Sequence, residues 1–126
     1  DAAVIVLCNT SGVPVSLIAD ALMRVYNGKS PIVTRDKYQE VSWDEKTIGE
    51  AVGMYVSGEG TEVELYQKED GTVGMRTDGK EQNLIPVNPR MAIIRGKMTD
   101  GNITLYWRNG KIFAIRYGGR MIPKSK

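Results

Sequence analysis

The C-terminal third combines aromatic and basic side chains in a pattern that suits recognition of an anion. Aromatic rings can stack on bases and guanidinium groups can bind phosphates, so a sheet that presents both can hold nucleic acid. No RNA-binding sequence motif or zinc knuckle accompanies the pattern, so it rests on composition alone. The rings are Tyr106, Trp107, Phe113 and Tyr117, and the anionic-partner candidates are Arg95, Lys97, Arg108, Lys111, Arg116 and Arg120.

Charge is divided unevenly along the chain. The net charge is +2, yet residues 1–89 hold eight Lys and Arg against fourteen Asp and Glu, whereas residues 90–126 hold nine against one. Such asymmetry indicates an electrostatic partner. Two alternatives stay open. The basic third can pair with the acidic segment 59–69, within one chain or in a homodimer, or its charges can simply face water.

Residues that usually perform catalysis are scarce. The chain has no histidine, which removes the commonest general base and the commonest metal ligand. Cys8 is the single cysteine, so no intramolecular disulfide forms within the chain, and we expect a buried thiol. The adjacent carboxylates Asp44 and Glu45 are typical of a helix start. We therefore expect no enzyme activity, no cofactor and no metal site.

Two glycine-containing segments have the composition of anion-binding loops but lack the spacing. Residues 9–12 lie between an apolar run and a helical pattern, where free N–H groups favour anions. Residues 117–120 are glycine-rich and basic. Neither segment contains the glycine pattern of a nucleotide-binding loop, so the sequence predicts no nucleotide site.

The first quarter of the chain predicts a strand followed by a helix. Residues 2–8 are continuously apolar, as in a strand that is buried on both faces. One apolar stripe then predicts a helix over about 14–26, ended by Asn27-Gly28. Two short extended stretches follow at 32–34 and 38–41. The stripe comprises Leu17, Ile18, Ala21, Leu22 and Val25.

A second helix is predicted over about 43–57. Ser42 and Glu45 have the spacing of a capping box, in which each side chain bonds the free backbone N–H of the other residue. The apolar stripe of this helix comprises Ile48, Ala51, Val52, Tyr55 and Val56.

From residue 61 onward the apolar period changes to two, which predicts antiparallel strands. Val63 and Leu65 alternate with charged residues. Pro86 cannot donate to a ladder, so residues 84–87 predict an edge or connecting segment. A C-terminal meander is expected over 91–98, 103–108 and 112–117. The hairpin turns are expected at Asp70-Gly71, Asp78-Gly79, residues 100–102 and Asn109-Gly110.

These elements predict an α+β fold in a single domain over residues 1–126. The two helices pack on one face of a mainly antiparallel sheet that ends in the C-terminal β-meander. The longest apolar run, residues 2–8, is too short to cross a bilayer.

Function is expected to reside in the surface. We expect a non-catalytic module that acts through protein–protein interaction, as an inhibitor, an immunity-type protein or an assembly component. The alternative is a small nucleic-acid-binding protein that uses residues 90–126. The protein-binding candidates are Trp43, Tyr55, Tyr106 and Arg108, because these residue types dominate interface hot spots.

The expected location follows from the first residue. The chain begins at Asp1 rather than at Met, and removal of a secretory signal would account for this. We therefore expect a periplasmic or secreted protein, with a cytoplasmic location as the alternative.

Overall fold

A computed structural model describes residues 1–10, 13–32, 37–97 and 99–125. The chain divides into two compact units, residues 1–37 and residues 38–126, which are described separately below. The expectation of one domain over residues 1–126 stays a prediction.

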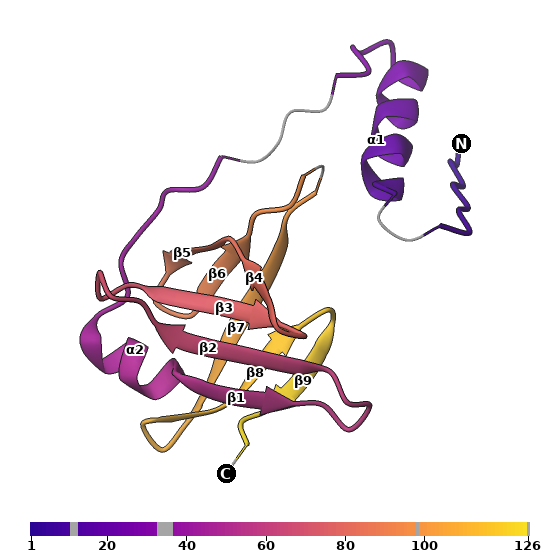
Figure 1. Cartoon of the computed structure of the whole chain (residues 1–126). Coiled ribbons are helices and arrows are strands. Elements are labelled where there is room, and N and C mark those ends of the chain that lie inside the picture. The colour runs from indigo at the N-terminus through magenta and orange to yellow at the C-terminus, as the bar shows by residue number, and fades with distance from the viewer. Residues whose placement is uncertain (11–12, 33–36, 98, 126) are drawn as a thin grey trace. The chain divides into compact units, whose positions relative to one another are not determined.

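The N-terminal unit contains the helix α1, Val15–Tyr26, within one residue of its expected start (Figure 1). Gly28, with a φ of +70°, follows the helix end as predicted. None of the α1 residues is buried, although we expected its apolar stripe to pack on the sheet. Among the described residues, no helix has the length and apolar character that a membrane span requires.

Residues 2–8 do not form the expected strand. They have no regular secondary structure, and the Cys8 thiol is exposed rather than buried. A strand needs a neighbour for its backbone hydrogen bonds, and the described part of residues 1–37 contains no other strand to provide them. The apolar run therefore remains uncovered within this unit.

The second helix is shorter than predicted. Helix α2 covers Glu45–Ala51, and strand β1, Gly53–Val56, occupies the rest of the expected helix. Gly53, with a φ of +145°, separates the two elements. The N-cap is Asp44, whose carboxylate accepts a hydrogen bond from the Thr47 N–H at 2.7 Å, and not Ser42 as we expected.

The sheet part of the fold is antiparallel throughout, as predicted, and is divided between two sheets. Within the described residues, one sheet has the order β1-β2-β3-β4 and the other β5-β6-β7-β8-β9, the latter being the expected meander extended at both ends (Figure 1). The remaining strands are β2 (Glu62–Gln67), β3 (Val73–Thr77), β4 (Lys80–Gln82), β5 (Leu84–Asn88), β6 (Met91–Ile94), β7 (Gly101–Arg108), β8 (Lys111–Tyr117) and β9 (Arg120–Pro123).

The hairpin turns largely follow the sequence signals. Asp78-Gly79 and Asn109-Gly110 both have two consecutive positive φ angles, which is the requirement of a type I′ turn. Gly118-Gly119 meets the same requirement and leads into β9, a strand that we did not predict. The glycine-rich segment 117–120 is therefore a hairpin turn. Met98 and residues 11–12 and 33–34 of the predicted segments lie outside the described residues.

One hydrophobic core joins the two sheets and α2. Ile48 and Ala51 of the helix are buried in it, together with inward-facing residues of both sheets. The predicted alternation holds in β2, where Val63 and Leu65 are fully buried. The largest fully buried side chains are Tyr55, Leu65, Met75, Ile103, Leu105, Ile115, Ile122 and Val63.

The two sheets meet where β1 approaches the end of β9. Tyr55 and Lys124 form an isolated antiparallel bridge, and the Ser125 N–H donates to the Met54 carbonyl at 2.7 Å. Lys124 also donates from Nζ to the Glu50 carbonyl oxygen at 2.6 Å, and burial lowers the pKa of its ammonium group. These contacts close the C-terminal unit along one side.

The edge strand β5 is covered by residues 38–43, which we call the strap. The Val41 N–H donates to the Pro86 carbonyl at 3.0 Å, and Trp43 Nε1 donates to the Asn88 carbonyl at 2.8 Å. Pro86 indicated an edge strand, and β5 is one. The strap occupies backbone acceptors that an uncovered edge would offer to other chains.

Candidate interaction surfaces

Two of the expected protein-binding residues are part of the core. The Trp43 side chain is 6% exposed and Tyr55 is fully buried. The Tyr55 hydroxyl donates to the Ala51 carbonyl at 2.6 Å. Burial raises the pKa of this phenol well above its usual range, and the nearby Glu50 carboxylate adds to the shift. In this arrangement both rings pack the fold and offer no surface to a partner.

The other two expected residues come together on the outer face of the five-stranded sheet. Tyr106 and Arg108 both contact Phe113, which lies on the neighbouring strand β8. The Tyr106 and Phe113 ring centroids are 6.4 Å apart, and the Arg108 guanidinium carbon lies 4.4 Å from the Phe113 centroid. We call these three residues the outer-face cluster.

A β-bulge accounts for the position of Phe113. Tyr106 is paired with Ala114 and Trp107 with Ile112, so β8 has one extra residue at this point. Alternation along β7 predicted that Trp107 would face the core, and it packs against the core. The bulge itself has no signature in the sequence, so the sequence did not predict the contact between Phe113 and Arg108.

One of the expected anion-binding cations, Arg108, belongs to the outer-face cluster, and two more lie beside it. Lys111 is paired with Arg108 across the hairpin, and Arg116 is paired with Thr104, two residues from Tyr106 on β7. Cross-strand partners and residues two apart share a face of a sheet. Arg108, Lys111 and Arg116 are all exposed.

The remaining expected cations lie elsewhere. Arg95 forms an ion pair with Asp100 at 2.8 Å, and Lys97 lies in the connection between β6 and β7. Arg120 pairs with Glu59, which realises in part the alternative that the basic third pairs with the acidic segment of the same chain. The six cations that the sequence predicted as one anion-binding set therefore do not form a single cluster.

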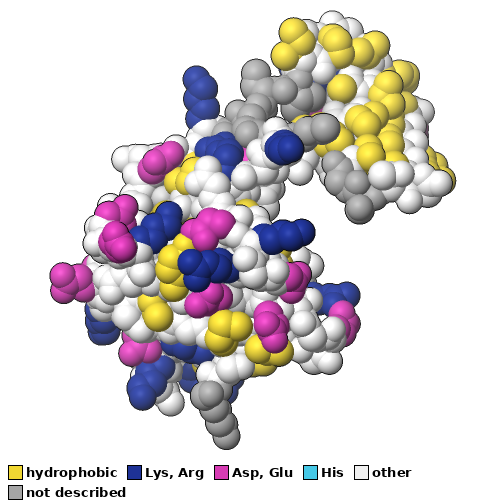
Figure 2. Space-filling view, in the orientation of Figure 1, with side chains coloured by type: hydrophobic (Ala, Val, Ile, Leu, Met, Phe, Trp, Pro, Cys, Tyr) yellow, Lys and Arg dark blue, Asp and Glu magenta, His cyan; other side chains and the backbone are white. Residues whose placement is uncertain are grey.

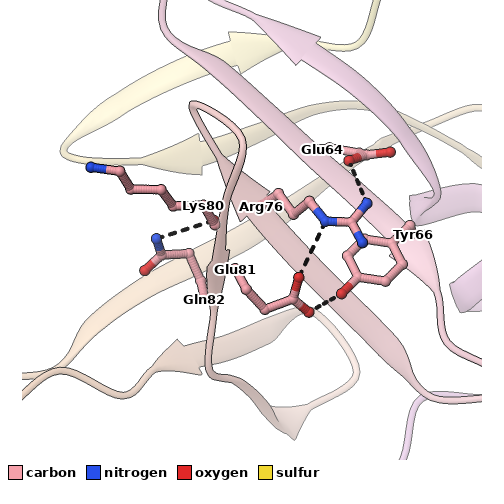
Figure 3. A network of polar contacts seen from close by, with 6 residues as sticks. All are labelled: Glu64, Tyr66, Arg76, Lys80, Glu81 and Gln82. Atoms are coloured by element: carbon pink, nitrogen blue, oxygen red, sulfur yellow. Dashed lines mark hydrogen bonds and ion pairs between the residues drawn. The ribbon is translucent and has the colours of Figure 1, made fainter.

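The outer face of the four-stranded sheet carries a network of matched charges (Figure 3). Arg76 binds Glu64 through Nη1 at 3.1 Å and Glu81 through Nε at 3.2 Å. The Arg76 guanidinium also lies 4.1 Å from the Tyr66 ring centroid, and the Tyr66 hydroxyl donates to Glu81. These groups satisfy one another, so we interpret the network as a cross-strand support rather than a binding site.

A cleft of about 510 Å³ opens beside the strap. Its floor includes Trp43, Val73 and Leu84, and its rim includes Lys68 and Asp70. The cleft could accept an apolar group. On its rim the Thr72 hydroxyl donates to the Asp70 carboxylate at 2.6 Å, within the exposed turn between β2 and β3. Within the described ranges, no group of three or more Cys, Asp and Glu residues is arranged to hold a metal ion.

The N-terminal unit presents an apolar surface that sequence reasoning missed. Among the described residues, eight of the eleven exposed large hydrophobic side chains belong to residues 1–32, and Figure 2 shows hydrophobic side chains gathered on one side of this unit. We expected a buried strand and a packed helix here, so the same residues were assigned to the core. The N-terminal apolar surface consists of Ile5, Leu7, Val13, Ile18, Leu22, Val25, Tyr26 and Ile32.

Comparison with known proteins adds no assignment. No family model, curated protein or solved structure matches this chain.

Proposed function

We propose that this chain is a protein-binding module whose N-terminal unit docks on an apolar surface of a protein partner. The observation that carries the proposal is the N-terminal apolar surface. Exposed apolar surface of this extent in a folded chain marks an interaction site, because burying it is favourable by about 25 cal/mol per Å².

The helix α1 supports this proposal. An amphipathic helix normally turns its apolar stripe toward a core. Here the stripe stays open: Ile18 is 39% exposed, Leu22 49% and Val25 54%. The partner therefore supplies the missing apolar layer over this side of the helix.

The segment ahead of the helix adds a second uncovered face. Ile5 is 82% exposed and Leu7 90%, whereas Val4 and Val6 on the alternate side are half-buried. Residues 1–28 contain only three charged residues, Asp1, Asp20 and Arg24. The centres of protein interfaces are depleted of charge in the same way.

The apolar character of this surface favours a lasting assembly over a transient encounter. Permanent interfaces are more hydrophobic than transient ones. Among the expected roles, an assembly component therefore fits better than a reversible inhibitor. Action by binding rather than by catalysis, and a location outside the cytoplasm, remain parts of this proposal.

The test is crosslinking from defined positions in the cells that produce the protein. A photoreactive amino acid at Leu22 should yield one discrete adduct with another protein, whereas the same group at Lys80, exposed on β4, should not. The identified partner is then purified and mixed with the chain. Ile18→Asp combined with Leu22→Asp should weaken this complex at least ~100-fold, because two charges would be buried without counter-charges.

The matched control is Ser16→Asp, which adds a charge to the exposed polar side of the same helix. Its affinity for the partner should equal that of the unmodified chain. An adduct formed only between two copies of this chain, or equal crosslinking from positions 22 and 80, would contradict a separate protein partner.

A further inference from the structure

The outer face of β7 and β8 carries positive charge that the fold itself does not neutralise. Within the part of the chain that the structure describes, Arg108, Lys111 and Arg116 form no ion pair and are exposed. Arg95 and Arg120 of the same basic third are matched by carboxylates. These three unmatched cations lie on one face of one sheet.

These cations extend along a strand. The β7 partners of Lys111 and Arg116, which are Arg108 and Thr104, are four residues apart, which corresponds to about 13 Å at roughly 3.3 Å per residue. This length is several times the spacing of ~3.4 Å between successive phosphates along a stacked nucleic-acid strand. The row can accordingly contact more than one phosphate of the same strand.

Aromatic rings lie between the cations. Tyr106 and Phe113 are half-buried, so part of each ring remains accessible. The Arg108 guanidinium lies over the Phe113 ring, 4.4 Å from its centroid, and a guanidinium group can make bidentate contact with phosphate. An acidic peptide would use the cations alone, whereas bases would use the rings as well.

We infer that this face, formed by the outer-face cluster with Lys111 and Arg116, binds single-stranded nucleic acid through phosphate contacts and base stacking. The inference goes beyond the proposed docking function and does not depend on it, because it uses other residues in the other unit of the chain.

The experiment is fluorescence anisotropy of labelled single strands of about 12 nucleotides, DNA and RNA, with the full chain. Three phosphate contacts on a single strand predict a slope of about −2 for log K against log salt. Affinity should consequently fall roughly 20-fold between about 50 and about 200 mM salt.

Variants divide the affinity into its two sources. Arg108→Gln combined with Arg116→Gln should reduce the slope by about 1.4, since each phosphate contact contributes about 0.7. Phe113→Leu should weaken binding about tenfold and leave the slope unchanged, because it removes stacking and no charge. Tyr106→Leu serves the same purpose if circular dichroism shows that Phe113→Leu unfolds the sheet.

The charge-matched control is Lys68→Gln combined with Lys80→Gln, which removes two exposed cations from the β2–β3 turn and β4. This variant should bind as the unmodified chain does. The inference is wrong if no single strand binds at about 50 mM salt, or if the control loses as much affinity as the arginine pair. It is also wrong if polyglutamate competes equally and neither ring substitution has an effect, which would indicate an acidic protein as the ligand.

Discussion

Tyr55 donates its hydroxyl proton to the Ala51 carbonyl at 2.6 Å inside the core, so that a helix end and a strand share one hydrogen bond. Tyr55→Phe keeps the ring but leaves the buried carbonyl without a donor. We expect a loss of about 1–3 kcal/mol in the free energy of unfolding. Urea denaturation followed by tryptophan fluorescence measures this loss, and an unchanged midpoint would show that the bond contributes nothing.

The raised pKa of Tyr55 also predicts how stability depends on pH. Because burial keeps the phenol neutral in the folded chain, the unfolded phenol ionises first, near pH 10. The contribution of Tyr55 is fully present below that pH and is lost as the pH rises further. Stability should fall more steeply above about pH 10 in the unmodified chain than in Tyr55→Phe. Parallel slopes would show that Tyr55 ionises equally in both states.

Asp44 caps α2, whereas sequence spacing pointed to Ser42. The hydrogen bond from Thr47 is the main cause that lowers the pKa of the Asp44 carboxyl. Its stabilising effect is therefore present above the pKa of the unfolded carboxyl and is lost as the pH falls through the folded value. Asp44→Ala should lower the thermal midpoint at neutral pH and reduce the acid dependence, and Ser42→Ala should do neither. The reverse result would restore Ser42 as the cap.

At the scale of elements, Gly74 of β3 allows the Tyr66 ring of β2 to lie across it. A Cβ at position 74 would overlap the ring, so Gly74→Ala would displace Tyr66 and break its hydrogen bond with Glu81 (Figure 3). We expect Gly74→Ala to destabilise the chain by up to about 1 kcal/mol. In a Tyr66→Leu background the same change should stabilise by about 0.4–1 kcal/mol, because it restricts the unfolded chain. Equal effects in both backgrounds would contradict this contact.

Patterns within short stretches of sequence predicted the elements whose formation depends on residues close together in the chain. Two-residue periodicity and Asn-Gly or Asp-Gly turns identified the hairpins, and the α1 stripe identified that helix to within a residue. The helix predicted over residues 52–57 was wrong. The spacing of Val52, Tyr55 and Val56 suits a helix, but the alternation of buried Tyr55 with exposed Met54 and half-buried Val56 suits a strand equally. Gly53 was the one available sign of a break.

Whether a predicted binding residue is accessible depends on burial, which residue type does not show. Residue type alone could not show that Trp43 and Tyr55 are in the core while Tyr106 and Arg108 are on the surface. The bulge that brings Phe113 to Arg108 depends on the register of two strands, which no local pattern specifies. The exposure of α1 could not be read from its stripe, because a stripe indicates a buried face without saying what covers it.

At the scale of the whole molecule, every member of the hydrophobic core cluster lies between Trp43 and Ile122. A chain consisting of residues 38–126 should therefore fold cooperatively with the unfolding midpoint of the full chain. It should also bind less of a hydrophobic dye such as ANS, because the N-terminal apolar surface is gone. A large drop in the midpoint would show that residues 1–37 stabilise the C-terminal unit.

The strap has a mechanical consequence when a partner protein is bound to α1. A partner that grips α1 pulls on the C-terminal unit through residues 38–43, whose attachment to β5 includes the hydrogen bonds from Val41 and Trp43. Tension along the chain accordingly loads the rim of the five-stranded sheet before it reaches the buried interior. Under force, the strap would detach from β5 first, and because α2 and β1 follow the strap along the chain, the β1–β9 seam would be loaded next.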